Sequence, residues 1–175
     1  MMADAIPISE PVAEDAVRWY VAHTRPRCEK KLFDHCLREQ VAATLPCYVS
    51  AHKYRGKTVV FQKPLFPGYV FLQLQPRFSS AIRQSDHVAN LLEVHDQATL
   101  EHQLAEIQLA LESGLEVRLA PTIGEGMRVR IKAGPLRGVE GWVEQRHGLD
   151  TVLLRLDFIS QAAVIQLGAE VLEPI

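Results

Sequence analysis

Two stretches decide the fold of this 175-residue chain: KPLFPGYVFLQL (residues 63–74) and GEGMRVRIKAGPLRGVEGWVEQ (residues 124–145). Each places Gly and Pro at turn positions around short runs that are rich in β-branched and aromatic residues. This composition is typical of β-strands joined by tight turns. Because the stretches lie about fifty residues apart, they predict two separate β-containing units.

Around the first stretch, apolar runs predict an alternation of strands and helices. WYVAHT (19–24) predicts a strand, and a helix with an apolar face and a basic face follows it. CYVSAH and TVVFQK predict a hairpin whose tip uses Gly56. A short helix near 79–85, a strand near 88–94 and an amphipathic helix capped by Asp96 or Thr99 complete the unit. The order βαβββαβα predicts an α+β fold with an antiparallel sheet and helices on one side of it.

Around the second stretch, five short runs predict a small closed β-barrel of the SH3 type. Gly134, Gly138 and Gly141 occupy turn positions that a side chain would obstruct, and Pro135 presets φ. The strands are expected at 128–132, 141–145, 151–156, 162–166 and 171–172. The predicted organisation is a flexible leader (1–17), an N-terminal domain (18–113), a linker (114–123) and the C-terminal barrel (124–175).

Charge is unevenly distributed along the chain, although the formal net charge is only −2. Residues 19–64 carry nine basic and three acidic residues, whereas residues 121–175 carry six and seven. A near-neutral total argues against a protein that coats nucleic acid nonspecifically, because such binding requires a surplus of Lys and Arg. A single basic region is therefore expected in the N-terminal domain.

No pattern of a catalytic or metal site occurs in the sequence. The seven histidines and three cysteines lack zinc-site spacing, and no phosphate-binding loop, dinucleotide fingerprint or nucleophile elbow is present. We therefore expect a protein that is not an enzyme and needs no cofactor and no metal. With neither a signal peptide nor a long apolar run, a cytoplasmic protein without a membrane partner is expected.

Strand alternation places Tyr69 and Phe71 on one face and Val70 and Leu72 on the other, with Phe66 just before the strand. Two interpretations are open from the alternation alone. The three rings could be part of the core, or they could form an exposed platform that a partner covers, because bare aromatic clusters are unusual on a free surface.

The order of four motifs resembles the N-terminal domain of the NusG family of transcription elongation factors. These motifs are WYVAH, the basic helix, Gly56-Lys57 and FPGYV. In that family the aromatic face docks on the clamp helices of RNA polymerase. The resemblance implies this role for Phe66, Tyr69 and Phe71, and more weakly for Tyr20 and His23. It also implies an edge that touches the non-template DNA strand, which assigns weak DNA contacts to Arg25, Arg27, Lys30 and Lys31.

The second stretch resembles the KOW motif of the same family, so the resemblance covers about residues 19–175. It implies that the barrel binds a ribosomal protein or the termination factor Rho, and that the whole chain is a monomeric elongation and antitermination factor. Leu65 and Phe71 resemble RfaH-like specialised members more than housekeeping NusG. Some relatives refold this domain into a helical hairpin, but its many Gly residues and Pro135 disfavour a helix here.

Two other functions remain open from the sequence. The chain could be an RNA-binding or ribosome-associated KOW protein, which predicts a basic barrel, yet residues 121–175 carry a net charge of −1. It could also be a small hydrolase, which would need an acid–base pair that the motifs do not supply.

Overall fold

The computed structural model describes residues 16–121, 126–146 and 149–175. The predicted leader falls mostly outside the described residues. The N-terminal part forms β1 (Arg18–Thr24), α1 (Glu29–Arg38), β2 (Ala42–Thr44), β3 (Cys47–Tyr54), β4 (Lys57–Pro64), β5 (Tyr69–Leu74), the 3₁₀ turn η1 (Pro76–Phe78), α2 (Ser79–Arg83), β6 (Val88–Glu93) and α3 (Gln97–Glu112). The α+β class is confirmed, with β2 as a short strand beyond the predicted set.

The N-terminal sheet has the strand order β2-β5-β1-β6, and all of its pairings are antiparallel. Alternation along β1 sends Ala22 to one face and Val21 to the other, and the two residues belong to different buried clusters. Leu32 of α1 and Ile82 of α2 lie in the cluster of Ala22. These two helices therefore cover one face, as expected.

The third helix corrects the expectation that helices lie on one side only. Leu100, Leu104 and Ile107 of α3 share a buried cluster with Val21, on the face opposite α1 and α2. Asp96 caps this helix as predicted, because its Oδ1 accepts the backbone N–H of Thr99 at 3.0 Å. None of the helices in the described ranges has the length and apolarity needed to cross a bilayer.

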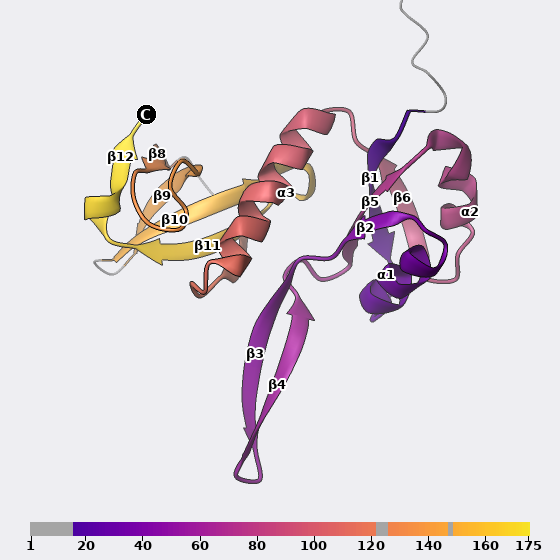
Figure 1. Cartoon of the computed structure of the whole chain (residues 1–175), viewed down its shortest axis with the longest axis horizontal. Coiled ribbons are helices and arrows are strands. Elements are labelled where there is room, and N and C mark those ends of the chain that lie inside the picture. Colours follow the sequence, from indigo (N-terminus) through magenta and orange to yellow (C-terminus); the bar gives the residue numbers. More distant parts are fainter. Residues whose placement is uncertain (1–15, 122–125, 147–148) are drawn as a thin grey trace, which may run out of the picture.

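The hairpin β3–β4 projects away from the body of the protein (Figure 1). Its two strands have eight residues each. They are paired along their whole length, from Cys47 opposite Pro64 to Tyr54 opposite Lys57. Arg55 and Gly56 both have positive φ (48° and 78°), as a two-residue I′ turn requires. The predicted use of Gly56 at the tip is thus confirmed.

The C-terminal part forms a second antiparallel sheet from β7 (Arg118–Pro121), β8 (Met127–Ile131), β9 (Glu140–Arg146), β10 (Leu149–Leu156), β11 (Gln161–Leu167) and β12 (Leu172–Pro174), with 3₁₀ turns η2 (Asp157–Ile159) and η3 (Ala169–Val171). Its order is β12-β8-β9-β10-β11-β7. The five predicted strands are confirmed, and no α-helix occurs in the described residues after α3. We call β7 to β12 the C-terminal domain.

One strand of this sheet comes from the predicted linker. In β7, Leu119 pairs with Ala163 and Ala120 pairs with Ala162 of β11. Part of the segment predicted as a linker (114–123) therefore forms a strand, because its backbone groups find partners on the free edge of β11.

The turn glycines of the KOW stretch serve two different purposes. Gly134 and Gly138 have φ of +83° and +90° with open space around them, so they are needed for their backbone conformation. A Cβ on Gly141 would lie 2.6 Å from Val152 Cγ1 and 2.8 Å from the Leu153 carbonyl oxygen. Only at Gly141 does the predicted steric obstruction apply.

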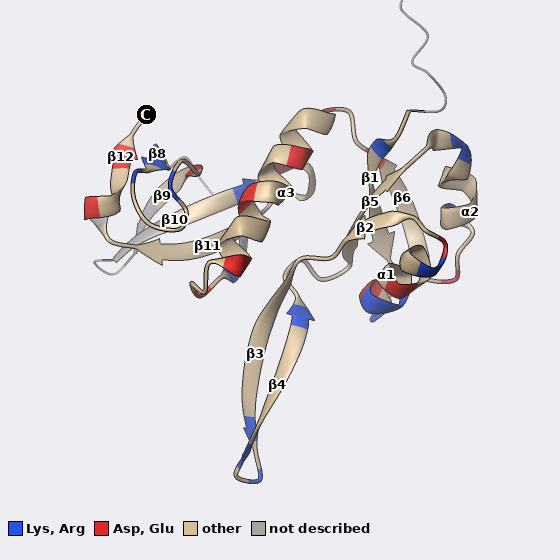
Figure 2. Cartoon of the chain, in the orientation of Figure 1, with Lys and Arg blue, Asp and Glu red and all other residues tan. Residues whose placement is uncertain are grey.

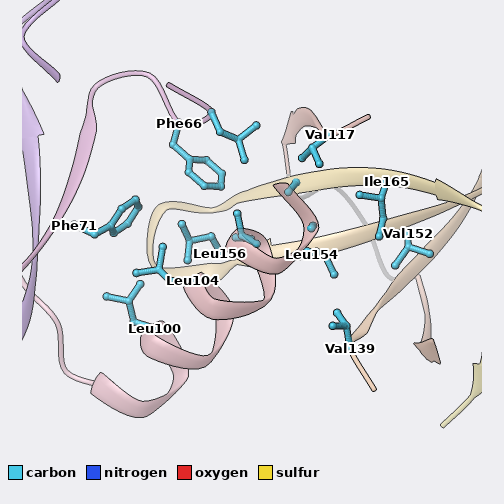
Figure 3. Packing of buried hydrophobic residues seen from close by; sticks show 14 of the residues in the cluster. Phe66, Phe71, Leu100, Leu104, Val117, Val139, Val152, Leu154, Leu156 and Ile165 are labelled. Atoms are coloured by element: carbon cyan, nitrogen blue, oxygen red, sulfur yellow. The ribbon is translucent and has the colours of Figure 1, made fainter. Parts of the chain in front are cut away.

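A single apolar cluster connects the two parts of the chain. It includes Val21 and Phe71 of the N-terminal sheet, Leu104 of α3, and Leu154 and Leu156 of β10. Figure 3 shows α3 with its buried leucines beside the phenylalanine rings and the end of β10. The helix thus lies between the two sheets (Figure 1).

Candidate functional site

Four rings gather at one end of the N-terminal sheet, and we call them the aromatic face: His23, Phe66, Tyr69 and Phe71. In the register of β1 and β5, His23 lies opposite Tyr69. Their rings stack with centroids 5.3 Å apart and an interplanar angle of 25°. Phe66 and Phe71 make an edge contact at 6.2 Å and 84°. The structure therefore brings together four of the five residues predicted to bind polymerase.

The aromatic face is not an open platform in this structure. Only 1% of Phe66 and 0% of Phe71 is exposed, whereas Tyr69 is half-buried and His23 is exposed. Of the two interpretations that the alternation left open, the core therefore applies to the two phenylalanines, and the exposed platform does not. The reason is that α3 and the C-terminal domain place their own apolar side chains over that face (Figure 3).

Tyr20, the fifth predicted residue, lies on the opposite face of the sheet. Its ring is 4% exposed and packs in the cluster of Leu32 and Leu72 beneath α1 and α2. Because Tyr20 lies one position from Val21 in an extended strand, the two side chains cannot share a face. Tyr20 therefore cannot contribute to the aromatic face.

The cover over the aromatic face is held by polar contacts between α3 and the C-terminal domain. Gln103 Nε2 donates to Asp157 Oδ2 at 2.8 Å, and the Asp157 backbone N–H donates to Gln103 Oε1 at 3.1 Å. The Glu140 backbone N–H donates to Glu106 Oε1 at 3.2 Å. We call these three hydrogen bonds the latch. Side-chain amides and carboxylates on α3 thus fix the position of the C-terminal domain.

At the other end of α3, Gln97 joins the helix to the N-terminal sheet. Its Nε2 donates to the Trp19 carbonyl oxygen at 3.0 Å, and the Trp19 N–H donates to its Oε1 at 2.5 Å. The same helix is therefore hydrogen-bonded to both halves of the molecule.

Glu106 is a titratable member of the latch. Burial raises the pKa of its carboxyl above the ordinary value of 4.5, and this effect outweighs the Glu140 backbone hydrogen bond and nearby His102, which act in the opposite direction. A raised pKa means that folding favours the protonated carboxyl. The contribution of Glu106 to stability is therefore fully present below pH 4.5 and is lost as the pH rises through its raised pKa.

Glu106→Gln is expected to raise the melting temperature at pH 7 and to flatten its dependence on pH above 4.5. Glutamine keeps an oxygen that accepts the Glu140 N–H but carries no charge to bury. Thermal unfolding followed by circular dichroism from pH 4 to 8 measures this difference. Glu101→Gln, on the exposed side of α3, is the control. A lower melting temperature for Glu106→Gln at pH 7 would contradict the assignment.

The four residues predicted to contact DNA lie together on an exposed edge. Arg25 and Arg27 lie in the turn before α1, and Lys30 and Lys31 lie in its first half. Lys30 Nζ donates to the Gln62 carbonyl oxygen of β4 at 2.6 Å, which joins this edge to the hairpin. Figure 2 shows basic residues on α1, at the base of β4 and at the hairpin tip.

In the described part of the chain, no three His, Cys, Asp or Glu side chains are grouped in a way that could hold a metal ion. Cys28, Cys36 and Cys47 are free thiols, and burial raises the pKa of Cys36 to about 11. A thiol with so high a pKa is protonated at neutral pH and is a poor nucleophile.

Sequence reasoning missed the latch residues Gln103, Glu106 and Asp157. The available signal was a Gln on the apolar side of the predicted helix, since Gln103 lies three residues after Leu100 and four before Ile107. Its partner on the C-terminal domain carries no local pattern of its own.

The family model described as "Transcription termination factor nusG" matches residues 17–109, which is more than half of the chain. Among curated proteins none matches. A solved structure titled "Domain interaction in Thermotoga maritima NusG" is similar, with a TM-score of 0.53 and 18% identity over 93% of this chain and 99% of that chain. The MjSpt4:Spt5 complex gives a TM-score of 0.27 and 18% identity over 90% and 96%. The matched segment contains the N-terminal sheet, all four rings of the aromatic face and most of α3, and on that basis the chain belongs to the NusG family of transcription factors.

Proposed function

We propose that this protein is a transcription elongation and antitermination factor that binds the clamp helices of RNA polymerase through the aromatic face. The observation that carries the proposal is that the family match coincides with a cluster of four aromatic rings. Aromatic side chains are enriched among the residues that dominate protein interfaces. The protein acts by binding, without catalysis of its own.

The buried state of Phe66 and Phe71 makes the proposal a two-state one. In the closed state described here, the C-terminal domain contributes Leu156 and its neighbours to the cluster that covers the rings. Polymerase binds the open state, in which the C-terminal domain has moved away. A ligand shifts such an equilibrium only by its preference for one state. The apparent dissociation constant for polymerase therefore equals that of the open state divided by the fraction of molecules that are open.

Tyr69 and His23 are the parts of the aromatic face that a partner can reach first. They are stacked on each other at the edge of the buried cluster, with His23 exposed. We infer that a clamp helix makes its initial contact there and then displaces the C-terminal domain from the phenylalanines.

The proposal also assigns functions to the basic edge and to the C-terminal domain. The basic edge of Arg25, Arg27, Lys30 and Lys31 contacts the non-template DNA strand weakly, since few phosphate contacts give a weak and salt-sensitive interaction. The released C-terminal domain recruits a ribosomal protein or Rho. The protein is an RfaH-like specialised member of the family. The protein acts as a monomer in the cytoplasm.

The combined substitution His23→Ala and Tyr69→Ala is expected to weaken binding to purified RNA polymerase at least about tenfold, because truncated aromatic anchors typically cost about 2 kcal/mol or more. Both residues are at least partly exposed, so the fold is retained. Biolayer interferometry with the full chain measures the affinity. Phe78→Ala, which removes a 48%-exposed ring near α2, is the control. Equal affinities for the wild type and the folded double variant would refute the assignment.

A further inference from the structure

The hairpin β3–β4 exposes several large apolar side chains that no other part of the described protein covers. Tyr54 is 69% exposed, Phe61 47% and Val60 60%. The hairpin contacts the body near its base, where Lys30 binds the Gln62 carbonyl and the Leu65 N–H donates to the Pro46 carbonyl. An isolated two-stranded ribbon is marginally stable in water, and exposed apolar groups gathered on one element indicate a binding surface.

The register of the hairpin separates two different faces. Residues that pair across the strands share a face, so Tyr54, His52 and Phe61 lie on one side. The His52 and Phe61 rings are 6.1 Å apart, which confirms the shared side. We call this side the ring face. The opposite side carries Val49 and Val60 and no aromatic residue.

The positive charge of the hairpin favours a polyanionic ligand. Residues 47–64 contain four basic residues and no acidic residue, in a chain of net charge −2. Lys57 and Lys63 belong to the ring face by register, and Arg55 at the tip lies over the Tyr54 ring at 5.8 Å. In Figure 2 the charged residues on this hairpin are all basic. Aromatic rings interleaved with cations are the combination that binds bases and phosphates together.

The spacing of the rings favours a single strand over a duplex. Side chains two residues apart on one face of a strand are about 6.6–6.8 Å apart. Bases in a duplex are stacked about 3.4 Å apart along each strand and present no free π-face. Unstacked bases of a single strand can instead lie on Tyr54, His52 and Phe61 in turn.

A polar group beside the rings favours RNA over DNA. His52 Nε2 lies 2.9 Å from Ser50 Oγ and 3.0 Å from Lys63 Nζ, next to the Phe61 ring. These groups can donate to and accept from a ribose 2′-hydroxyl, the group by which proteins distinguish RNA from DNA. We propose that the ring face of the β3–β4 hairpin binds single-stranded RNA, with bases on its aromatic rings and phosphates on its Lys and Arg side chains.

The test is fluorescence anisotropy of a labelled 12-nucleotide single-stranded RNA of mixed sequence with the purified full chain and no polymerase. Tyr54→Ala with Phe61→Ala is expected to weaken binding at least about tenfold, because each stacked ring contributes about that much. Arg55→Ala with Lys57→Ala is expected to reduce the slope of log affinity against log salt by about 1.4. Val49→Ala with Val60→Ala changes the opposite side and should leave binding unchanged.

The outcomes separate this proposal from its alternatives. Equal losses from the two double-alanine pairs, Tyr54/Phe61 and Val49/Val60, would overturn the ring face as the binding surface. Equal or tighter binding of a single-stranded DNA of the same sequence would overturn the assignment to RNA. Tighter binding of the same RNA annealed to its complement would overturn stacking of unpaired bases on the rings. Because the assay omits polymerase, its failure leaves the clamp-binding proposal unaffected.

Discussion

Replacing Phe71 with alanine is expected to lower the free energy of unfolding by about 3–5 kcal/mol. Phe71 is completely buried and belongs to the cluster that includes the N-terminal sheet, α3 and β10. Removing its ring leaves a cavity at the junction of all three. Because a domain is typically stable by only about 5–15 kcal/mol, the variant should be markedly destabilised in urea denaturation.

Phe61→Ala is the matched control for this measurement. It makes the same chemical change at a ring that is 47% exposed on the hairpin, so little packing is lost and the expected cost is within about 1 kcal/mol. If Phe71→Ala cost no more than Phe61→Ala, the aromatic face would be open in solution. The same reasoning makes Phe71 a poor probe of polymerase binding, since loss of binding would follow from loss of the fold.

Removing the Gln103–Asp157 part of the latch is expected to tighten polymerase binding. Gln103→Ala with Asp157→Ala deletes two hydrogen bonds that hold the C-terminal domain on α3, each contributing about 0.5–1.5 kcal/mol. Losing both bonds lowers the free energy of opening by the sum of their contributions. When most molecules are closed, the open fraction rises by the corresponding factor. The apparent affinity should then increase by roughly 5- to 150-fold, measured by biolayer interferometry.

Gln108→Ala is the control for the latch variant. Gln108 lies on the exposed side of the same helix and binds Glu112 rather than the C-terminal domain. Its removal should leave the affinity for polymerase unchanged. Weaker binding by the latch variant would mean that the closed arrangement supports polymerase binding, contrary to the two-state proposal.

The sequence was sufficient to predict the local structure of the aromatic face. A period of two along 69–74 correctly separated Tyr69 and Phe71 from Val70 and Leu72. The same period applied to β1 would have excluded Tyr20, because Val21 and His23 pair with Phe71 and Tyr69 while Tyr20 pairs with Leu72. The role that the family resemblance implied for Tyr20 therefore does not fit the alternation of β1.

What covers the aromatic face could not be predicted from periodicity. An amphipathic helix such as α3 shows which of its sides is apolar, but not which face of a sheet receives it. The docking of the C-terminal domain depends on contacts such as Gln103–Asp157, separated by 54 residues in sequence. For the same reason the strand β7 was missed, since its pairing with β11 is a tertiary contact.

For the hairpin, too, the sequence predicted the strands but not the surroundings of their side chains. Its strands and tip followed from apolar runs and Gly56, and its basic character from the composition. The exposure of Tyr54 and Phe61 did not follow, because an aromatic residue in a strand is usually packed against a neighbouring element. The exposure of these two rings and the register of the two strands identify the ring face only in the structure.

Hydrogen–deuterium exchange at the Asp157 backbone amide tests most directly whether polymerase binds an open state. In the closed state this N–H donates to Gln103 of α3, so its exchange reports separation of the C-terminal domain from the helix. We predict faster exchange when saturating RNA polymerase is added to the full chain. Unchanged or slower exchange with polymerase bound would show that the C-terminal domain remains in place and would contradict the proposed opening.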